Sequence, residues 1–193
     1  FARWQLWSRG ESAGLAAARN EAFRAARTAA VLVLDADNIL LPRCAQRLWA
    51  ALDRTGASAS YPLLERFGDD PGLMNRRAWE PARLLRCNTT DALALVRREA
   101  WAKLGGYRKL EVHGWEDWDF WLRLAKTGGW AAQVPEILAR YRCHLGSMLH
   151  RETYPDAAPL RERFRREHGV VFDGDGRTDA VVALRRHRPA PGT

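Results

Sequence analysis

Two aspartates, Asp35 and Asp37, directly follow the short apolar run Val31–Leu34. Such a run is typical of a strand buried on both faces of a parallel sheet, and open α/β sheets bind ligands beyond the carboxyl ends of their strands. Carboxylate oxygens at that place suit Mg²⁺ or Mn²⁺ together with substrate phosphates. Asp and Asn are also ordinary turn residues, so a plain turn or helix cap is the alternative interpretation.

A second acidic group stands at the start of a predicted helix. Glu116, Asp117 and Asp119 lie there among the indoles of Trp115 and Trp118. The helix dipole favours carboxylates near an N-terminus, but it does not explain the tryptophans. Adjacent helix positions point about 100° apart, so Glu116 and Asp117 cannot serve one site in the same way. A carboxylate partly desolvated by indoles gains proton affinity and suits a general base, with a solvated helix cap as the alternative.

A third group, Arg142 and His144, follows the predicted strand Ile137–Tyr141. A neutral imidazole is a metal ligand and a guanidinium binds phosphate, so the pair suits the metal and phosphate chemistry suggested by Asp37. Taken alone, a single His is more often a structural residue. A nucleophile pair made of Cys143 and His144 is disfavoured, since neighbours on a strand point to opposite faces.

The elements that must position these groups alternate between helix and strand. Apolar spacing, β-prone runs and Gly or Pro punctuation favour an α/β fold. The expected helices cover residues 13–30, 42–56, 98–104, 115–126 and 158–168, and the expected strands cover 31–34, 57–64, 91–96 and 137–141. The stretch 65–90 is irregular and shows no clear pattern of helix or strand.

Composition limits the function classes. The 193 residues are 47% hydrophobic with a formal charge of +8, which fits one globular domain. The basic residues are spread along the chain with acidic ones between them, so we expect no nucleic-acid partner. No apolar run is long enough to span a bilayer. The three cysteines form no Cys-x-x-Cys pair, which favours a reducing compartment such as the cytoplasm.

Taken in order, these segments resemble the family 2 glycosyltransferases, which are inverting nucleotide-sugar enzymes with the GT-A fold. The resemblance runs from about Gly14 to Met148. It rests on Gly14-Leu15 with Ala18-Arg19-Asn20, Leu34-Asp35-Ala36-Asp37 with Pro42, Arg97-Arg98-Glu99-Ala100-Trp101 with Gly105-Gly106-Tyr107, the block Trp115–Leu124, and Tyr141-Arg142 with His144 and Ser147.

The resemblance implies a Rossmann-like, GT-A-type α/β fold, with a mixed but mostly parallel sheet flanked by helices. The family normally begins with a strand-helix unit that recognises the nucleotide base, well before the Asp-x-Asp pair. We therefore expect an N-terminally incomplete fold. Residues 1–150 would form a partial glycosyltransferase domain, and residues 151–193 a C-terminal helix followed by an Arg-rich, loosely ordered tail.

The family's roles carry over to matching positions. The implied cofactor is Mn²⁺ or Mg²⁺, held by Asp37 and His144. Catalysis is assigned to Asp117 as the base with Glu116 beside it, donor binding to Arg19, Asn20, Asp35 and Arg142, and acceptor or sugar binding to Trp115, Trp118 and Gly106. The two tryptophans could equally be core residues. Asn38 stands where many relatives carry a further Asp, which leaves the affinity for metal open.

The expected reaction moves a sugar from a nucleotide-diphosphate donor to a hydroxyl of a carbohydrate or glycoconjugate acceptor, with inversion. A catalytically degenerate domain that only binds carbohydrate or nucleotide is the alternative. The expected location is the cytoplasm. Contact with the inner face of the membrane is left open, because Arg185, Arg186 and Arg188 of the tail could meet anionic lipid.

Overall fold

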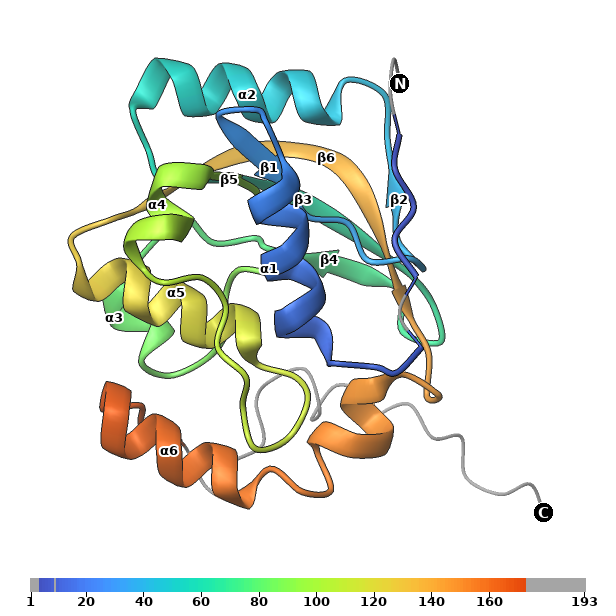
Figure 1. Cartoon of the computed structure of the whole chain (residues 1–193), viewed down its shortest axis with the longest axis vertical. Helices are drawn as coiled ribbons and strands as arrows, with labels where there is room; N and C mark the ends of the chain where they lie inside the picture. Colours follow the sequence, from blue (N-terminus) through green and yellow to red (C-terminus); the bar gives the residue numbers. More distant parts are fainter. Residues whose placement is uncertain (1–3, 9, 173–193) are drawn as a thin grey trace.

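The computed structural model describes residues 4–8 and 10–172, which form a six-stranded sheet with helices on both faces (Figure 1). No helix in this part of the chain has the length and apolar character needed to cross a bilayer. The elements are α1 (Leu15–Ala25), β1 (Ala30–Leu32), β2 (Ile39–Leu40), α2 (Cys44–Thr55), β3 (Ala59–Gly68), β4 (Gly72–Met74), α3 (Pro81–Leu84), β5 (Leu95–Arg97), α4 (Arg98–Lys103), α5 (Glu116–Lys126), β6 (Ala131–Cys143), a π-helical turn (Leu149–Thr153) and α6 (Ala158–His168).

The strand order is β1-β5-β3-β6-β2. The short strand β4 is not part of this order and pairs with β3 at Leu64–Arg66. The expected mixed sheet flanked by helices is confirmed, but its pairing is mostly antiparallel, and only β3 and β6 pair in parallel among the described strands. Helix α2 does connect two strands that run in one direction, β1 and β3. However, β5 lies between them and runs the opposite way, so two antiparallel pairings replace one parallel pairing.

Strand β1 is an edge strand of this sheet as described. Its three residues are only half-buried, and Leu34 just beyond it is 44% exposed. Val31 packs against the cluster on one face of the sheet, and Ala30 and Leu32 pack against the cluster on the other face, so both faces of β1 are covered as expected. The burial is incomplete because β1 has a neighbouring strand on one side only in the described part of the chain.

Two apolar clusters pack against opposite faces of the sheet. On α2, Leu48 and Leu52 are one helical turn apart and fully buried against β5 and β6. Helices α1, α5 and α6 share the larger cluster on the other face. Neighbouring residues of β5 show the division, since Leu95 belongs to the first cluster and Val96 to the second. The molecule is thus a helix-sheet-helix sandwich.

Strand β6 bends midway, as its curved ribbon shows in Figure 1. Its pairing with β3 shifts register between Pro62 and Leu63, where the partner residue changes from Val134 to Ile137, and again at Leu64. The intervening Pro135 lacks an amide hydrogen, so a bulge is the natural place for it inside a central strand. Beyond the bulge, β6 pairs with β2 as well as with β3.

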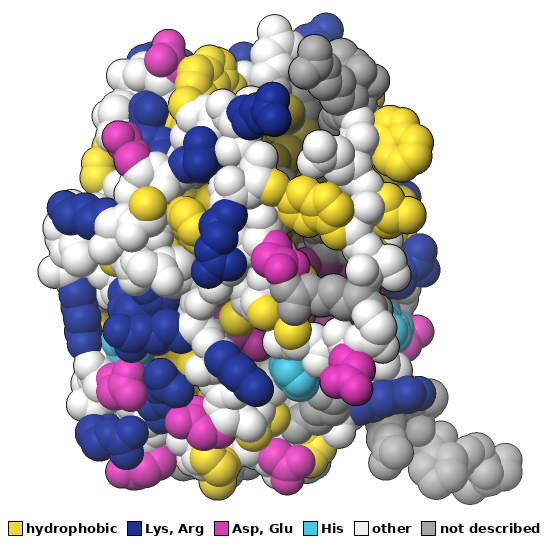
Figure 2. Space-filling model, viewed as in Figure 1, with side chains coloured by type: hydrophobic (Ala, Val, Ile, Leu, Met, Phe, Trp, Pro, Cys, Tyr) yellow, Lys and Arg dark blue, Asp and Glu magenta, His cyan; other side chains and the backbone are white. Residues whose placement is uncertain are grey.

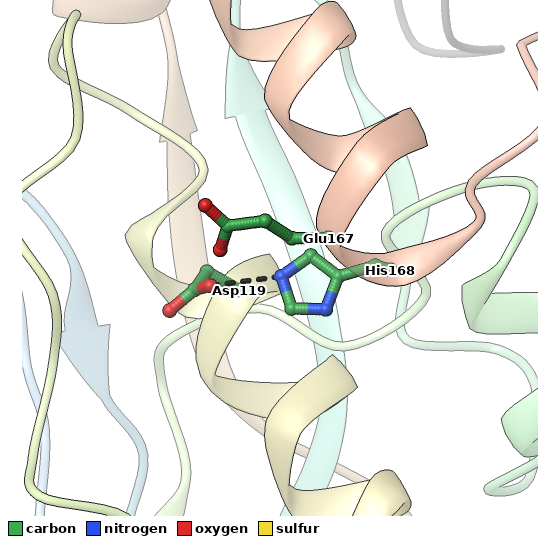
Figure 3. A group of neighbouring side chains, drawn as sticks. All are labelled: Asp119, Glu167 and His168. Atoms are coloured by element: carbon green, nitrogen blue, oxygen red, sulfur yellow. Dashed lines mark hydrogen bonds and ion pairs between the residues drawn. The ribbon is translucent and has the colours of Figure 1, made fainter.

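Helix α6 packs on α5 through aromatic rings. Trp115 and Trp118 lie 5.5 and 5.1 Å from Phe164, measured between ring centroids, and Phe164 is fully buried. A buried polar group crosses the same contact. Arg123 Nε donates to Asp119 Oδ2 at 2.8 Å, and His168 Nε2 lies 3.0 Å from Asp119 Oδ1 (Figure 3).

The Asp119 carboxylate is fully buried, so its partners decide its charge state. Burial alone would raise its pKa, but the hydrogen bond with His168 and the charge of Arg123 outweigh burial and hold the pKa below its usual range. A depressed pKa means that this carboxylate stabilises the fold above its unfolded-state pKa. That contribution is lost as the pH falls through the folded-state pKa.

Asp119→Ala should lower the free energy of unfolding by about 3–5 kcal/mol at neutral pH, because it leaves the Arg123 charge buried without its partner. Urea unfolding measures the change. The matched control is Glu80→Ala, which breaks the exposed pair with Arg83 and should cost less than about 1 kcal/mol. Equal losses for the two variants would show that the buried pair does not hold α5 and α6 together.

Candidate active site

The loop between β1 and β2 carries Asp35 and Asp37 to the end of β6. In the β2-β6 ladder Ile39 faces Arg140 and Leu40 faces Ala139, so residues before Ile39 approach residues after Arg140. Accordingly, Asp37 Oδ2 lies 3.6 Å from His144 Nε2. The structure thus brings together the two residues predicted as metal ligands, although 107 positions separate them in the sequence.

Asn38 fixes this approach. Its side chain is buried, and its Oδ1 accepts a hydrogen bond from the backbone N–H of Arg142 at 3.0 Å. Its own N–H donates to Asp35 O, which closes the turn. Asn38 therefore joins the aspartate loop to β6. A ligand role is therefore not needed to explain Asn38 at this position.

The donor atoms of Asp37 and His144 fit a divalent cation. One carboxylate and one imidazole match the ligand preferences of Mn²⁺, and a carboxylate with phosphate oxygens matches those of Mg²⁺. Both side chains are accessible, at 45% and 40% exposure. Arg142 lies beside them and is exposed, with its guanidinium 4.7 Å from the centre of the Phe67 ring.

Helix α1 contributes Arg19, whose guanidinium bonds both carboxylate oxygens of Asp35 at 3.0 and 3.4 Å. The Arg19 side chain is 10% exposed and also lies 5.6 Å from the Tyr107 ring centre. Burial alone would lower its pKa, but the charges of Asp35 and Asp117 raise the pKa above its usual range, so the residue stays cationic. Arg19 therefore places a fixed positive charge between the two acidic groups.

Asn20, next on α1, bonds the chain itself. Its Oδ1 accepts from Trp101 Nε1 and from the Tyr107 N–H, and its Nδ2 donates to Tyr107 O. Gly106 has a φ of +81°, and a Cβ there would lie 2.5 Å from Asn20 Oδ1. The structure thus gives Asn20 and Gly106, expected at the donor and acceptor, a shared task of holding this turn against α1.

Asp117 is the second residue of α5, and the helix begins directly after Trp115, which adopts a left-handed φ of 61°. Asn88 Nδ2 donates to Asp117 Oδ2 at 3.0 Å, and the Trp118 N–H donates to Oδ1. Burial raises the pKa of Asp117 and the charge of Asp35 adds to it, while Arg19 and Asn88 oppose the rise. The outcome is a carboxylate with increased proton affinity, as a general base requires.

Glu116 is 3% exposed, and burial raises its pKa as well. Its Oε1 lies 3.9 Å from His113 Nδ1. The side chains of Glu116 and Asp117 thus have different partners, as the angle between adjacent helix positions predicts. Asp117 lines the large cavity described below, and Glu116 is not among the residues found in that lining.

Trp115 and Trp118 belong to the aromatic contact between α5 and α6. Trp118 has no exposed surface and donates from Nε1 to Leu84 O at 2.8 Å. Stacking on a sugar is therefore excluded for Trp118 in this conformation, and of the two interpretations its packing supports the core. Trp115 is 7% exposed, which leaves an edge of the ring for contact with a ligand.

A cavity of about 460 Å³ opens over Asp117. This volume lies in the range of small-molecule sites. Its lining joins the start of α5 to the loops around β4 and α3, and it includes Tyr141 of β6. A smaller cavity of about 80 Å³ adjoins Arg142 and His144, and Tyr141 lines both. Asp117 therefore faces a space next to the one lined by Arg142 and His144, whereas Asp37 is not among the residues found in either lining.

Asp91 is a lining residue that the sequence analysis missed. Its N–H donates to Asn75 Oδ1 at 3.0 Å, and its Oδ1 accepts from the Leu93 N–H at 2.8 Å. Burial raises its pKa to about 7, and the charges of Asp117 and Asp35 add to the rise. In the sequence Asp91 is only the first residue of the expected strand 91–96, and nothing in the pattern marks it for chemistry. Because β5 runs antiparallel to β1, the start of β5 lies beside the end of β1, from which the aspartate loop leaves the sheet.

Asp91→Asn tests whether ionisation of the Asp91 carboxyl group destabilises the fold. Its folded-state pKa of about 7 lies above the ordinary 3.8, so the folded chain binds the proton more tightly and loses stability as the pH rises between these values. The amide can still accept from Leu93. The variant should gain about 1–3 kcal/mol in free energy of unfolding at pH 8 and nothing at pH 4, allowing for partial exposure.

Denaturant unfolding at the two pH values measures this gain. Asp53→Asn, at an exposed position of α2, is the control and should change nothing at either pH. A gain for Asp91→Asn that is the same at pH 4 and pH 8, or absent at both, contradicts the assignment of a raised pKa.

A second cluster of potential metal ligands lies away from the aspartate loop, at Asp119, Glu167 and His168 where α6 ends against α5 (Figure 3). Its carboxylates are already paired with cations. Asp119 bonds Arg123, and Glu167 lies 3.2 Å from Arg108 and 3.1 Å from Arg163. A divalent cation here would meet three guanidinium groups, so the cluster fits a structural ion-pair network and not a metal site.

Comparison with known proteins identifies the family of this chain. The family model of Glycosyl transferase family 2 matches residues 3–109. A similar solved structure is that of S. aureus TarS 1-349, with a TM-score of 0.53, 13% identity, and coverage of 67% of this chain and 40% of that one. The chain thus spans less than half the length of TarS 1-349. No relative was found among curated proteins. Because the family model covers more than half of its residues, the chain belongs to glycosyl transferase family 2.

Proposed function

We propose that the protein transfers a sugar from a nucleotide-diphosphate sugar to a hydroxyl of a carbohydrate or glycoconjugate, with inversion at the anomeric carbon. The observation that carries this proposal is that Asp117 lines a cavity that shares Tyr141 with the cavity lined by Arg142 and His144. Arg19 bonds Asp35 of the aspartate loop, and its charge also acts on Asp117 of α5. A donor-binding group and a base are thus within electrostatic reach of each other.

On the donor side, Asp35 and Arg19 would contact the ribose or sugar, and Arg142 would neutralise the leaving phosphate. Asp37 and His144 would hold Mn²⁺ or Mg²⁺, which supplies Lewis-acid stabilisation of the leaving diphosphate. Asn38 and Asn20 are positioning residues in this account. Asn38 ties the aspartate loop to β6, and Asn20 ties α1 to the Gly106 turn.

On the acceptor side, Asp117 would take the proton from the attacking hydroxyl. Asn88 and the Trp118 N–H hold its carboxylate in place, and its increased proton affinity supports this transfer. The oxygen of that hydroxyl then forms a bond to the anomeric carbon from the face opposite the nucleotide, and the bond to the diphosphate oxygen breaks. One displacement inverts the configuration. Glu116, beside Asp117, would act on the base through its charge.

The other partners expected from the sequence remain proposals. On the face shown in Figure 2, Lys and Arg side chains are dispersed and interrupted by Asp and Glu, which does not favour a duplex-binding surface there. The proposed location is the cytoplasm, with peripheral membrane contact as a further option. The tail arginines that suggested such contact lie outside the described residues, as do residues 173–193 of the proposed second segment, 151–193.

Asp117→Asn should lower the transfer rate by about 10²–10⁴-fold, because the amide cannot accept the hydroxyl proton. Binding of UDP, GDP or dTDP in the presence of Mn²⁺, measured by calorimetry, should stay within a factor of two or so of the parent protein, since the residue is placed on the acceptor side. Asp53→Asn is the control and should change neither quantity.

The same experiment separates transfer from the degenerate-binder alternative. A parent protein that binds a nucleotide diphosphate but transfers sugar no faster than the Asp117→Asn variant would favour a domain that binds without turnover. Normal turnover by that variant would exclude Asp117 as the base.

A further inference from the structure

We infer that the acceptor carries an anionic group, a phosphate or a carboxylate, bound by Arg76 and Arg77 while its reacting hydroxyl meets Asp117. The inference rests on the proposed function, because it assigns the cavity over Asp117 to the acceptor. All three residues line that one cavity. Guanidinium groups bind phosphate and carboxylate through paired, charge-assisted hydrogen bonds.

The other cationic side chains of this cavity have acidic partners, whereas Arg76 and Arg77 have none in the part of the chain that the structure describes. Arg66 NH1 lies 2.6 Å from Asp70 Oδ2, and Arg83 Nε lies 2.9 Å from Glu80 Oε2. Within residues 4–8 and 10–172, no hydrogen bond or ion pair engages the guanidinium of Arg76 or Arg77, and both residues are exposed. Their charges are therefore available to a ligand.

The loop that presents these arginines is firmly held. Asn75 adopts a left-handed φ of 57°, which is uncommon for a residue other than glycine, and its side chain is buried. Its Nδ2 donates to Pro62 O of β3, and its Oδ1 accepts from the Asp91 N–H. Tyr61 donates from its hydroxyl to Arg77 O at 2.9 Å. These contacts fix the backbone of residues 75–77 at the cavity before any ligand binds.

The charges of the cavity suit a ligand with one neutral end and one anionic end. Asp91 and Asp117 would repel an anion placed beside them, so the end of the acceptor at these residues should be a neutral hydroxyl. An anionic group would lie instead at Arg76 and Arg77. The diphosphate of the donor does not account for these arginines, since Arg142 and His144 line the separate, smaller cavity and neither Arg76 nor Arg77 is among its lining residues.

The test compares the binding of matched soluble probes: methyl glucoside, methyl glucoside 6-phosphate, methyl glucuronide and inorganic phosphate. We expect the phosphorylated or carboxylated glycoside to bind about tenfold to a hundredfold more tightly than methyl glucoside, as charge-assisted hydrogen bonds provide. Arg76→Ala/Arg77→Ala should abolish that preference. The control Arg24→Ala/Arg54→Ala removes the same charge from the ends of α1 and α2 and should retain it.

A vesicle experiment identifies the source of the anion. Phosphatidylcholine vesicles with and without phosphatidylglycerol are sedimented with the protein. Stronger binding to the anionic vesicles that is lost in Arg76→Ala/Arg77→Ala, but not in the control variant, would assign the anion to a lipid-linked acceptor. A preference for the soluble anionic glycosides alone would assign it to the glycan.

Several results would overturn the inference. One is equal binding of neutral and anionic probes, vesicles included. Another is equal loss of binding in the two double variants, and a third is inorganic phosphate binding as tightly as the glycoside phosphate. Calorimetry of UDP, GDP and dTDP with Mn²⁺ on the full-length protein, including any nucleotide-base-binding unit outside residues 1–193, separates this failure from that of the proposed function. Nucleotide binding without anion preference rejects only the anionic acceptor, whereas absence of all nucleotide binding rejects the transferase assignment.

Discussion

The buried guanidinium of Arg123 is the constraint on which much of the site depends. It pairs with Asp119 on its own helix and donates to Leu104 O and Gly106 O, and so fixes α5 against the turn that follows α4. Asn20 bonds the other side of that turn and thereby orients α1, which carries Arg19. The first turn of α5 carries Asp117. One charged group in the core therefore sets the relative positions of the base and of the cation beside Asp35.

The end of β6 supplies the second constraint. The bulge at Pro135 lets the strand bend, and its distal half then pairs with β2. Asn38 completes this link by accepting from the Arg142 N–H. The β2-β6 pairing and the Asn38 hydrogen bond thus hold the aspartate loop beside the end of β6. A preformed arrangement of this kind lowers the conformational cost of ligand binding, because little ordering remains to be done when the donor arrives.

Much of this architecture is visible in the sequence. Helix α6 covers the predicted residues 158–168, and α5 begins one residue after the predicted start, because long helices with a clear apolar stripe and glycine stops are read reliably. Strand β6 begins at Ala131, six residues before the expected start, since Pro135 interrupts the β pattern. The directions of the strands could not be predicted in the same way. A helical crossover such as α2 normally places its two strands side by side in parallel, but β5 lies between β1 and β3 and runs antiparallel to both.

The residues of the candidate site could likewise be predicted only in part. Chemically distinctive residues with a family pattern, such as Asp37, His144 and Asp117, could be singled out from the sequence. Asp91 could not, because its importance comes from the reversed direction of β5. Asn20, Gly106 and Trp118 match family positions, yet their contacts are with the chain itself. Tertiary hydrogen bonds and burial decide such roles, and local sequence does not encode them.

The central claim is that Asp37 and His144 belong to the same site as Asp117. Paramagnetic broadening by substoichiometric Mn²⁺, recorded in amide and side-chain NMR spectra with a nucleotide diphosphate present, tests it most directly. The account predicts that broadening centres on Asp37 and His144 and extends to Asp117, while His168 stays sharp. Broadening centred on Asp119, Glu167 and His168 instead would place the metal in the α5-α6 contact and contradict the account.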